Sequence, residues 1–139
     1  MSKAFAAAGL RLGYLVANPK IVDEVQKVRL PYHLSLLTQA AAIATLKHAD
    51  LQLEQVGLLR EEREALSEWL EGHGLQVAPS ASNFLMFGRL ENPTGVWEKL
   101  VEKGVLVREV GPVGYLRVTV GTPEENKKFK EALEEVLRW

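Results

Sequence analysis

Cysteine is absent from the 139 residues, so the chain has neither a disulfide framework nor a thiolate metal site. Histidine is scarce, and its three scattered residues predict no zinc site. Positive charge is not in excess, because 17 basic residues stand against 18 acidic ones, and this balance disfavours nucleic acid as a partner. No apolar run approaches the roughly 20 residues that a membrane-spanning helix needs. We therefore expect a cytoplasmic protein without a metal site, a membrane anchor or a nucleic-acid partner.

The composition is typical of a globular protein, and the sequence has two parts with different hydrophobic patterns. An apolar fraction of 47% and a charged fraction of 25% are ordinary for a folded domain. In the first 48 residues, a strand is expected over 12–17 and helices over 21–30 and 36–46. The second helix is apolar on nearly every side and has no sheet of its own to cover it. We interpret residues 1–48 as the tail end of a larger domain, and we expect altered packing or self-association where that domain is missing.

Residues 49–139 alternate between short strands and helices with one apolar face. The pattern predicts, in order, a long amphipathic helix over 50–71, a strand over 82–87, a helix opened by Asn92-Pro93, strands over 105–107 and 115–120, and a last helix opened by Thr122-Pro123. Such a string predicts a compact α/β fold, with a three-stranded sheet and helices on one face. We expect these residues to form a self-contained domain.

Ser2, Lys3 and Arg11 lie near the start of the chain among alanines and glycines. A lysine amine can form a Schiff base with an aldehyde, and an arginine guanidinium can hold a phosphate through paired hydrogen bonds. Small residues between them allow the backbone to approach a ligand closely. Residue chemistry alone leaves a second interpretation open, in which Lys3 is a solvent-exposed terminal lysine and Arg11 caps a strand.

The segment 2–13, with its serine, lysine, small residues, glycine and then Arg-Leu-Gly, resembles the attachment signature of pyridoxal 5′-phosphate (PLP) aminotransferases of fold type I. The similarity continues along the whole chain. It implies that Lys3 attaches PLP covalently and shuttles a proton, and that Ser2 and Arg11 bind the cofactor phosphate. It also implies that residues 49–139 are the small C-terminal domain of such an enzyme, and that residues 1–48 are the last strand and helices of the large PLP-binding domain.

Three further residues acquire roles from the resemblance. Arg117 interrupts an apolar, alternating strand, and a buried arginine needs an anionic partner. Arg117 matches the family's arginine for the substrate α-carboxylate, and Arg108 ends a segment similar to the strand that supplies a phosphate-binding arginine in histidinol-phosphate aminotransferases. Asn83 matches an asparagine near the active-site mouth, although by residue type alone it is equally compatible with a turn or a strand edge.

The resemblance implies PLP-dependent transamination between histidinol phosphate and 2-oxoglutarate, with glutamate as the second amino acid. Relatives that act on aromatic amino acids or threonine phosphate are close alternatives. A different class of interpretation is a non-catalytic α/β binding module derived from an aminotransferase tail. Family members are homodimers, so we expect a homo-oligomer. In the family, the groups that hold the pyridine nitrogen and the phosphate precede the attachment lysine, and we therefore expect the chain by itself to be inactive.

Overall fold

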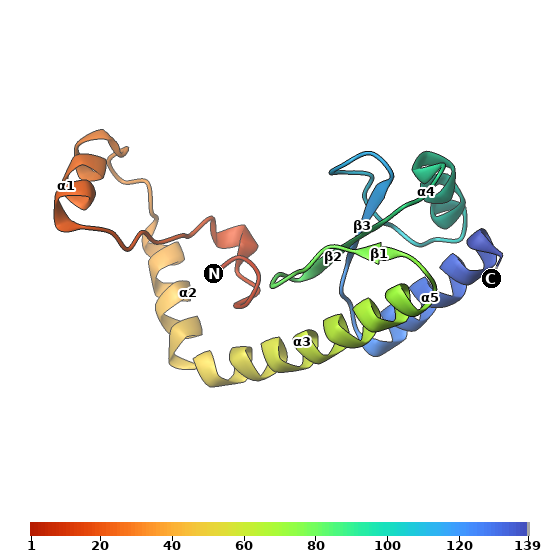
Figure 1. The fold of residues 1–139 in the computed structure, drawn as a ribbon. Helices are drawn as coiled ribbons and strands as arrows, with labels where there is room; N and C mark the ends of the chain where they lie inside the picture. Colours follow the sequence, from red (N-terminus) through yellow and green to blue (C-terminus); the bar gives the residue numbers. More distant parts are fainter. Residues whose placement is uncertain (139) are drawn as a thin grey trace. The chain divides into compact units, whose positions relative to one another are not determined.

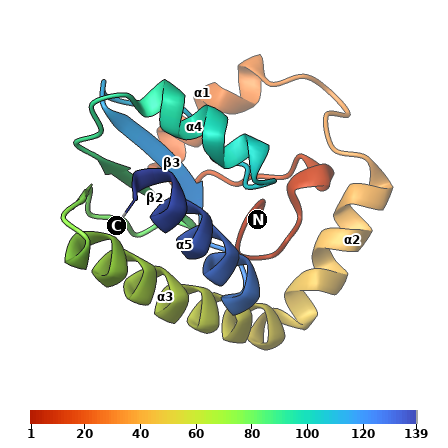
Figure 2. The same cartoon turned by 90° about the vertical axis from the view of Figure 1, so that its right-hand side faces the viewer.

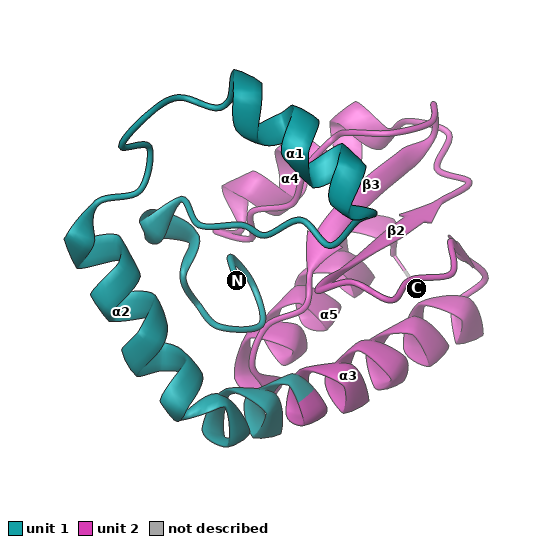
Figure 3. Cartoon of the chain, turned by 90° about the vertical axis from the view of Figure 1, so that its left-hand side faces the viewer, with its two compact units in different colours: residues 1–56 teal, residues 57–139 magenta. Residues whose placement is uncertain are grey.

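Two compact units divide the chain within one long helix (Figure 3). The computed structural model describes residues 1–138. Unit 1 comprises residues 1–56, and unit 2 begins at Gly57. The dividing helix, α3, spans Ala49–Gly72 and contributes its first turns to unit 1 and the remainder to unit 2. The border that the sequence predicts, between residues 48 and 49, coincides with the start of α3, whereas the border of the compact units lies further along it.

Unit 1 carries two α-helices whose starts are explained by local caps (Figure 1). The side chains of Asn18 and Ser35 accept hydrogen bonds of 3.0 Å from the backbone N–H groups of Lys20 and Thr38. Both helices confirm the expectation from the sequence. The elements of unit 1 that precede α3 are the 3-10 helix η1 (Ala8–Leu10) and the helices α1 (Pro19–Val28) and α2 (Leu36–Lys47).

The expected strand over residues 12–17 is wrong. The backbone from Leu12 to Asn18 belongs to no helix or strand. A strand is defined by ladder hydrogen bonds to a neighbouring strand, and all strands in the described residues lie in unit 2. The apolar side chains of Tyr14 and Val16 are accordingly 83% and 85% exposed. The apolar run predicted a strand, but no neighbouring strand among the described residues lies beside it to form the ladder hydrogen bonds.

Unit 2 contains a three-stranded antiparallel sheet in the order β1-β2-β3, which confirms the α/β class. Two expected strands are present, and helices form where the sequence predicts them. The elements after α3 are the strands β1 (Gln76–Val77), β2 (Phe84–Gly88) and β3 (Tyr115–Thr119), and the helices α4 (Pro93–Glu102) and α5 (Pro123–Leu137).

The third expected strand, over residues 105–107, is also wrong. Only Arg108 pairs with the sheet, through an isolated bridge to Arg117, and the third strand is instead the short edge strand β1. The segment is held by α4 instead: the Val105 N–H donates to the Leu100 carbonyl at 2.9 Å, and the Val107 carbonyl accepts a hydrogen bond of 3.0 Å from the indole N–H of Trp97. These bonds tie the segment to α4, and its pairing with β3 is confined to Arg108.

The hydrophobic core lies on one face of the sheet, under α3, α4 and α5 (Figure 2). Alternate residues of β2 and β3 point into it, and the Phe87 ring meets the Phe129 ring of α5 edge to face at a centroid distance of 5.7 Å. The opposite parity puts Phe84, Met86 and Arg117 on the other face. The buried core consists of Leu66, Leu70, Leu75, Leu85, Phe87, Leu100, Val107, Leu116, Val118, Val120, Phe129, Ala132 and Leu133.

Asn126, a buried polar residue in α5, joins three elements at the end of β3. Its side-chain amide donates hydrogen bonds to the Glu62 carboxylate at 2.8 Å and to the Gly121 carbonyl at 3.2 Å. Its side-chain oxygen accepts from the Gly121 N–H at 3.0 Å. Thr122 and Glu125, which lie between Gly121 and Asn126 in the sequence, form a reciprocal capping box that starts α5. These bonds fix the strand that carries Arg117 against α3 and α5.

Candidate functional site

The six residues that the sequence singles out fall into two groups. Ser2, Lys3 and Arg11 belong to unit 1, and Asn83, Arg108 and Arg117 belong to unit 2. The structure brings Arg108 and Arg117 together as direct partners.

The first residues of unit 1 form a sequence of tight turns around Lys3. The carbonyl of Met1 accepts hydrogen bonds from the N–H groups of Phe5 at 3.3 Å and Ala7 at 3.4 Å, and the carbonyl of Lys3 accepts from Ala6 at 2.9 Å. Ala6 takes a left-handed conformation in these turns, with φ of 47°, which residues with a Cβ rarely adopt. Ser2 is half-buried, and the Lys3 side chain is exposed. The turns therefore present the lysine amine to solvent.

Arg11 ends the short helix η1 in a left-handed conformation, with φ of 50°. Its Nη1 atom donates a long hydrogen bond of 3.3 Å to the Ala8 carbonyl. The guanidinium is exposed and forms no ion pair with another described residue. An amine, a hydroxyl and a guanidinium with free N–H groups make a donor set that fits a ligand with an aldehyde and a phosphate, which is the chemistry of PLP.

Arg108 and Arg117 form an antiparallel bridge at the edge of the sheet. The Arg108 N–H donates to the Arg117 carbonyl at 2.9 Å, and the Arg117 N–H donates to the Arg108 carbonyl at 2.7 Å. Residues paired in this way project their side chains to the same face, and like charges directly opposite each other repel. The pair therefore makes a doubly positive spot on the face that the core helices leave open.

The Arg117 side chain is half-buried, and its Nε atom is fully buried without a hydrogen-bond partner. Its guanidinium carbon lies 4.7 Å from the centroid of the Phe84 ring, a cation–π contact that holds the side chain in place. A buried N–H without a partner costs about 1–3 kcal/mol. An anion that binds this guanidinium would relieve the repulsion from Arg108, and one that also reached Nε would recover that cost.

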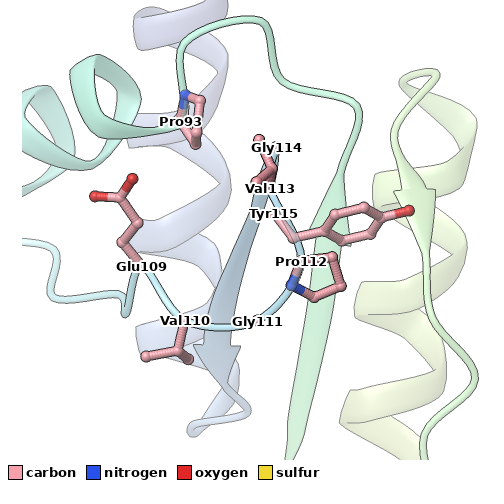
Figure 4. Close-up of a pocket in the computed structure, with 8 residues that line it drawn as sticks. All are labelled: Pro93, Glu109, Val110, Gly111, Pro112, Val113, Gly114 and Tyr115. Atoms are coloured by element: carbon pink, nitrogen blue, oxygen red, sulfur yellow. The ribbon is translucent and has the colours of Figure 1, made fainter.

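A loop over residues 109–114 joins the two arginines and lines a shallow cavity of about 200 Å³ (Figure 4). In Figure 4 the side chains of Glu109 and Tyr115 point away from each other at the two ends of the loop. The Glu109 carboxylate accepts a hydrogen bond of 2.7 Å from the Thr94 hydroxyl. The cavity is lined by Pro93, Glu109, Val110, Gly111, Pro112, Val113, Gly114 and Tyr115.

Asn83 is half-buried just before β2, and its backbone carbonyl accepts a hydrogen bond of 3.0 Å from the Val120 N–H. This contact extends the pairing of β2 with β3 by one step. A role at the mouth of an active site stays a prediction. The sequence analysis missed Phe84, whose ring contacts the Arg117 guanidinium, and Met86, which shares the same face; the alternation of β2 already placed both there.

Two other kinds of site find no support in the described residues. Residues 1–138 contain no group of three or more histidine, aspartate or glutamate side chains that could hold a metal ion. None of the helices in this range is long and apolar enough to cross a membrane.

Comparison with known proteins connects these features to one family. The chain is 58% identical over 133 residues to histidinol-phosphate aminotransferase of Thermobifida fusca and 53% identical over 138 residues to that of Streptomyces avermitilis. These matches cover 96% and 99% of this chain, but the chain spans only 36% and 37% of the relatives' length.

Its fold matches a solved structure as well. Histidinol-phosphate aminotransferase from Sinorhizobium meliloti in complex with pyridoxal-5′-phosphate superimposes with a TM-score of 0.84 at 27% identity, over 99% of this chain and 39% of that one. The family model described as aminotransferase class I and II matches residues 1–133. The chain therefore belongs to the class I and II aminotransferase family.

Proposed function

We propose that this chain forms the C-terminal part of a PLP-dependent aminotransferase that acts on histidinol phosphate and 2-oxoglutarate in histidine biosynthesis. The observation that carries the proposal is the bridged pair of Arg108 and Arg117, with its buried, unpartnered Nε atom. Relatives at 49–58% identity named histidinol-phosphate aminotransferase support this substrate over aromatic amino acids.

In this proposal, unit 1 holds the cofactor. Lys3 attaches PLP through its amine, and the Ser2 hydroxyl and the Arg11 guanidinium donate hydrogen bonds to the cofactor phosphate. When bound, PLP supplies a conjugated ring that accepts the electron pair left at the substrate α-carbon. Once the substrate amine has displaced Lys3 from the cofactor, the freed Lys3 amine can take up the proton from that carbon, and the exposure of its side chain leaves it free to move.

Unit 2 recognises the anionic groups of the substrates. Histidinol phosphate has a phosphate ester where an amino acid has its α-carboxylate, whereas glutamate has carboxylates. One arginine pair must therefore accept both kinds of anion in the two halves of the reaction. Arg117 binds the α-carboxylate, Arg108 adds a second guanidinium for the phosphate, and Asn83 lies at the mouth of the site.

The proposal extends to assembly and location. Residues 1–48 belong to the large PLP-binding domain, and residues 49–139 form the small domain with its connecting helix. The exposed apolar side chains of α1 and α2, such as Leu36 at 84% and Val28 at 82%, would be covered in a larger homo-oligomeric enzyme. We place this enzyme in the cytoplasm, where glutamate and 2-oxoglutarate are abundant.

The test is a chimera in which this chain replaces the segment that it matches in the Thermobifida fusca relative. We expect the chimera to bind PLP and to transfer the amino group of histidinol phosphate to 2-oxoglutarate. Lys3→Ala should abolish turnover, because it removes the amine that attaches the cofactor and carries the proton. Phenylalanine, which lacks the phosphate, should react with much lower kcat/KM.

Three outcomes would contradict the proposal. One is a folded chimera that binds PLP but prefers phenylalanine to histidinol phosphate. Another is full turnover by the Lys3→Ala variant, which would remove Lys3 from the reaction. A third is a chimera that folds without binding PLP, which would favour a non-catalytic binding module.

A further inference from the structure

Met86 lies on the arginine face of the sheet and is the direct partner of Arg117 in the β2–β3 register. Arg108 lies on the other side of Arg117, in the isolated bridge. Directly paired residues project to the same face, so Met86, Arg117 and Arg108 form one row across the sheet. The proposed function uses the two arginines of this row and leaves Met86 without a role.

Gly111 brings the loop between the two arginines onto Met86. A Cβ atom at position 111 would overlap the Cε atom of Met86 and would lie 3.6 Å from its sulfur. The φ angle of Gly111 is 111°, a conformation that side chains with a Cβ rarely adopt. The loop backbone therefore rests on the end of the methionine side chain, and a side chain at position 111 would have to displace that end.

The same loop is tied at both ends. The Thr94 hydroxyl donates to the Glu109 carboxylate at 2.7 Å, and the Leu90 N–H donates to the Gly114 carbonyl at 3.2 Å. Met86 supplies the support in the middle. Because Arg108 immediately precedes this loop, a loop that moves away from the sheet also moves the Arg108 end of the bridge.

We propose that Met86 is a positioning residue: by supporting Gly111 it holds Arg108 beside Arg117, so that both guanidinium groups engage one doubly charged anion. The inference rests on the proposed function, which assigns the arginine pair to substrate anions. A methionine suits this place because its unbranched thioether adapts to the backbone that packs on it. A singly charged carboxylate needs one guanidinium and depends far less on the loop.

The experiment is a pair of NMR titrations of the full chain, one with inorganic phosphate and one with acetate, followed at the arginine Nε–Hε signals. The variants are Gly111→Ala, Met86→Ala and the double variant. Gly104→Ala is the matched control, because Gly104 also has a positive φ of 76° but has nothing within 4 Å of a Cβ. It introduces the same kind of backbone strain without touching the loop.

We expect Gly111→Ala and Met86→Ala each to weaken phosphate binding about tenfold and acetate binding less than about twofold. The double variant should be little worse than either single variant, because both changes disturb the same contact, one by overlap and the other by truncation. The control should bind both anions as the unaltered chain does. If Gly111→Ala fails to fold, as judged by its amide spectrum, the phosphate-to-acetate ratio of Met86→Ala decides the matter alone.

Equal losses for phosphate and acetate, or fully additive losses in the double variant, would overturn the positioning role while leaving the arginine pair as an anion site. An unaltered chain that binds phosphate no better than acetate would overturn the pairing of Arg108 with Arg117 on one anion, and this inference with it. The two failures are therefore distinguishable.

Discussion

Units 1 and 2 are both rich in apolar residues, but they bury them to very different extents. Leu66 and Leu70 on the unit 2 part of α3 are 0% exposed, whereas Leu36 and Leu37 on α2 are 84% and 83% exposed. The core cluster comes entirely from residues 66–133, and the buried hydrophobic residues of unit 1 are Ala7 and Ala42. The difference shows that apolar composition alone does not produce a core.

Helix formation, in contrast, is similar in the two units. Ser35 caps α2 and Thr122 caps α5, each through a hydrogen bond from a backbone N–H near the helix start. These signals are local and act whether or not a helix is covered. What unit 2 adds is a sheet whose alternating residues give its helices a surface to pack on.

The largest expected effect concerns activity. We expect the isolated chain, supplied with PLP, to transaminate histidinol phosphate no faster than free PLP does, because Lys3 is exposed and unit 1 buries little around it. The measurement is a single-turnover assay with histidinol phosphate and 2-oxoglutarate, compared with the chimera. Product formation well above the level of free PLP, and lost in Lys3→Ala, would show that self-association builds a working pocket.

The next largest effect is on stability. Phe87→Ala should lower the free energy of unfolding of unit 2 by about 3–5 kcal/mol, because it removes a fully buried ring from the core. Leu37→Ala, at an exposed site, should change it by less than about 0.5 kcal/mol. Urea denaturation followed by tryptophan fluorescence measures both, since Trp69 and Trp97 pack against the core. Similar losses in the two variants would mean that α2 is as well covered as the sheet.

The same contrast explains how much of the fold the sequence could predict. Every helix that the pattern indicated is present, because caps and 3.6-residue periodicity are properties of the local chain. The strands over 12–17 and 105–107 failed because a strand also needs a partner. Residues 12–17 have none, and the segment 105–107 is bonded to α4 through Val105 and Val107 and meets β3 only at Arg108.

Some features of the candidate site could also be predicted from the sequence, and others could not. Arg117 could be found from the sequence because a charge in an apolar alternating strand is conspicuous, and Arg108 followed from the resemblance to a family. Their direct pairing could not be predicted, since it depends on the register of an eight-residue connection. The contact between Met86 and Gly111 was equally inaccessible, because it arises from the path of a loop.

Arg117→Ala should affect substrate binding without affecting the stability of unit 2. In the chimera it should raise KM for glutamate and lower kcat/KM, because a charge-assisted contact to the carboxylate is lost. The loss of transition-state stabilisation should be about 2–4 kcal/mol. The free energy of unfolding of unit 2 should be nearly unchanged, because Arg117 points away from the core and removal of its unpartnered Nε offsets the lost contact with the Phe84 ring. Arg60→Ala, on the exposed side of α3, is the control. Unchanged kinetics for every substrate would exclude Arg117 from the site.

A smaller effect tests whether the apolar surface of unit 1 associates. We expect the weight-average mass of the isolated chain to rise with concentration, because contiguous exposed apolar residues favour contact with another copy. Leu37→Lys should weaken this association by about 1–2 kcal/mol. Light scattering over a range of concentrations is the measurement, with Glu61→Lys on unit 2 as the control. A monomer at all concentrations, with α2 still helical, would contradict the expectation.

The smallest effect belongs to Thr94, which holds the Glu109 carboxylate through its hydroxyl at 2.7 Å. Thr94→Val keeps the shape of the side chain but removes the donor, so that Glu109, next to Arg108 in the sequence, can pair with the arginines and compete with an anion. We expect phosphate affinity to fall by about 0.5–1.5 kcal/mol, the net value of one hydrogen bond. Thr94→Ser, which keeps the hydroxyl, should bind as the unaltered chain does. The same NMR titration measures both variants, and an unchanged affinity in Thr94→Val would show that Glu109 does not reach the arginine pair when released.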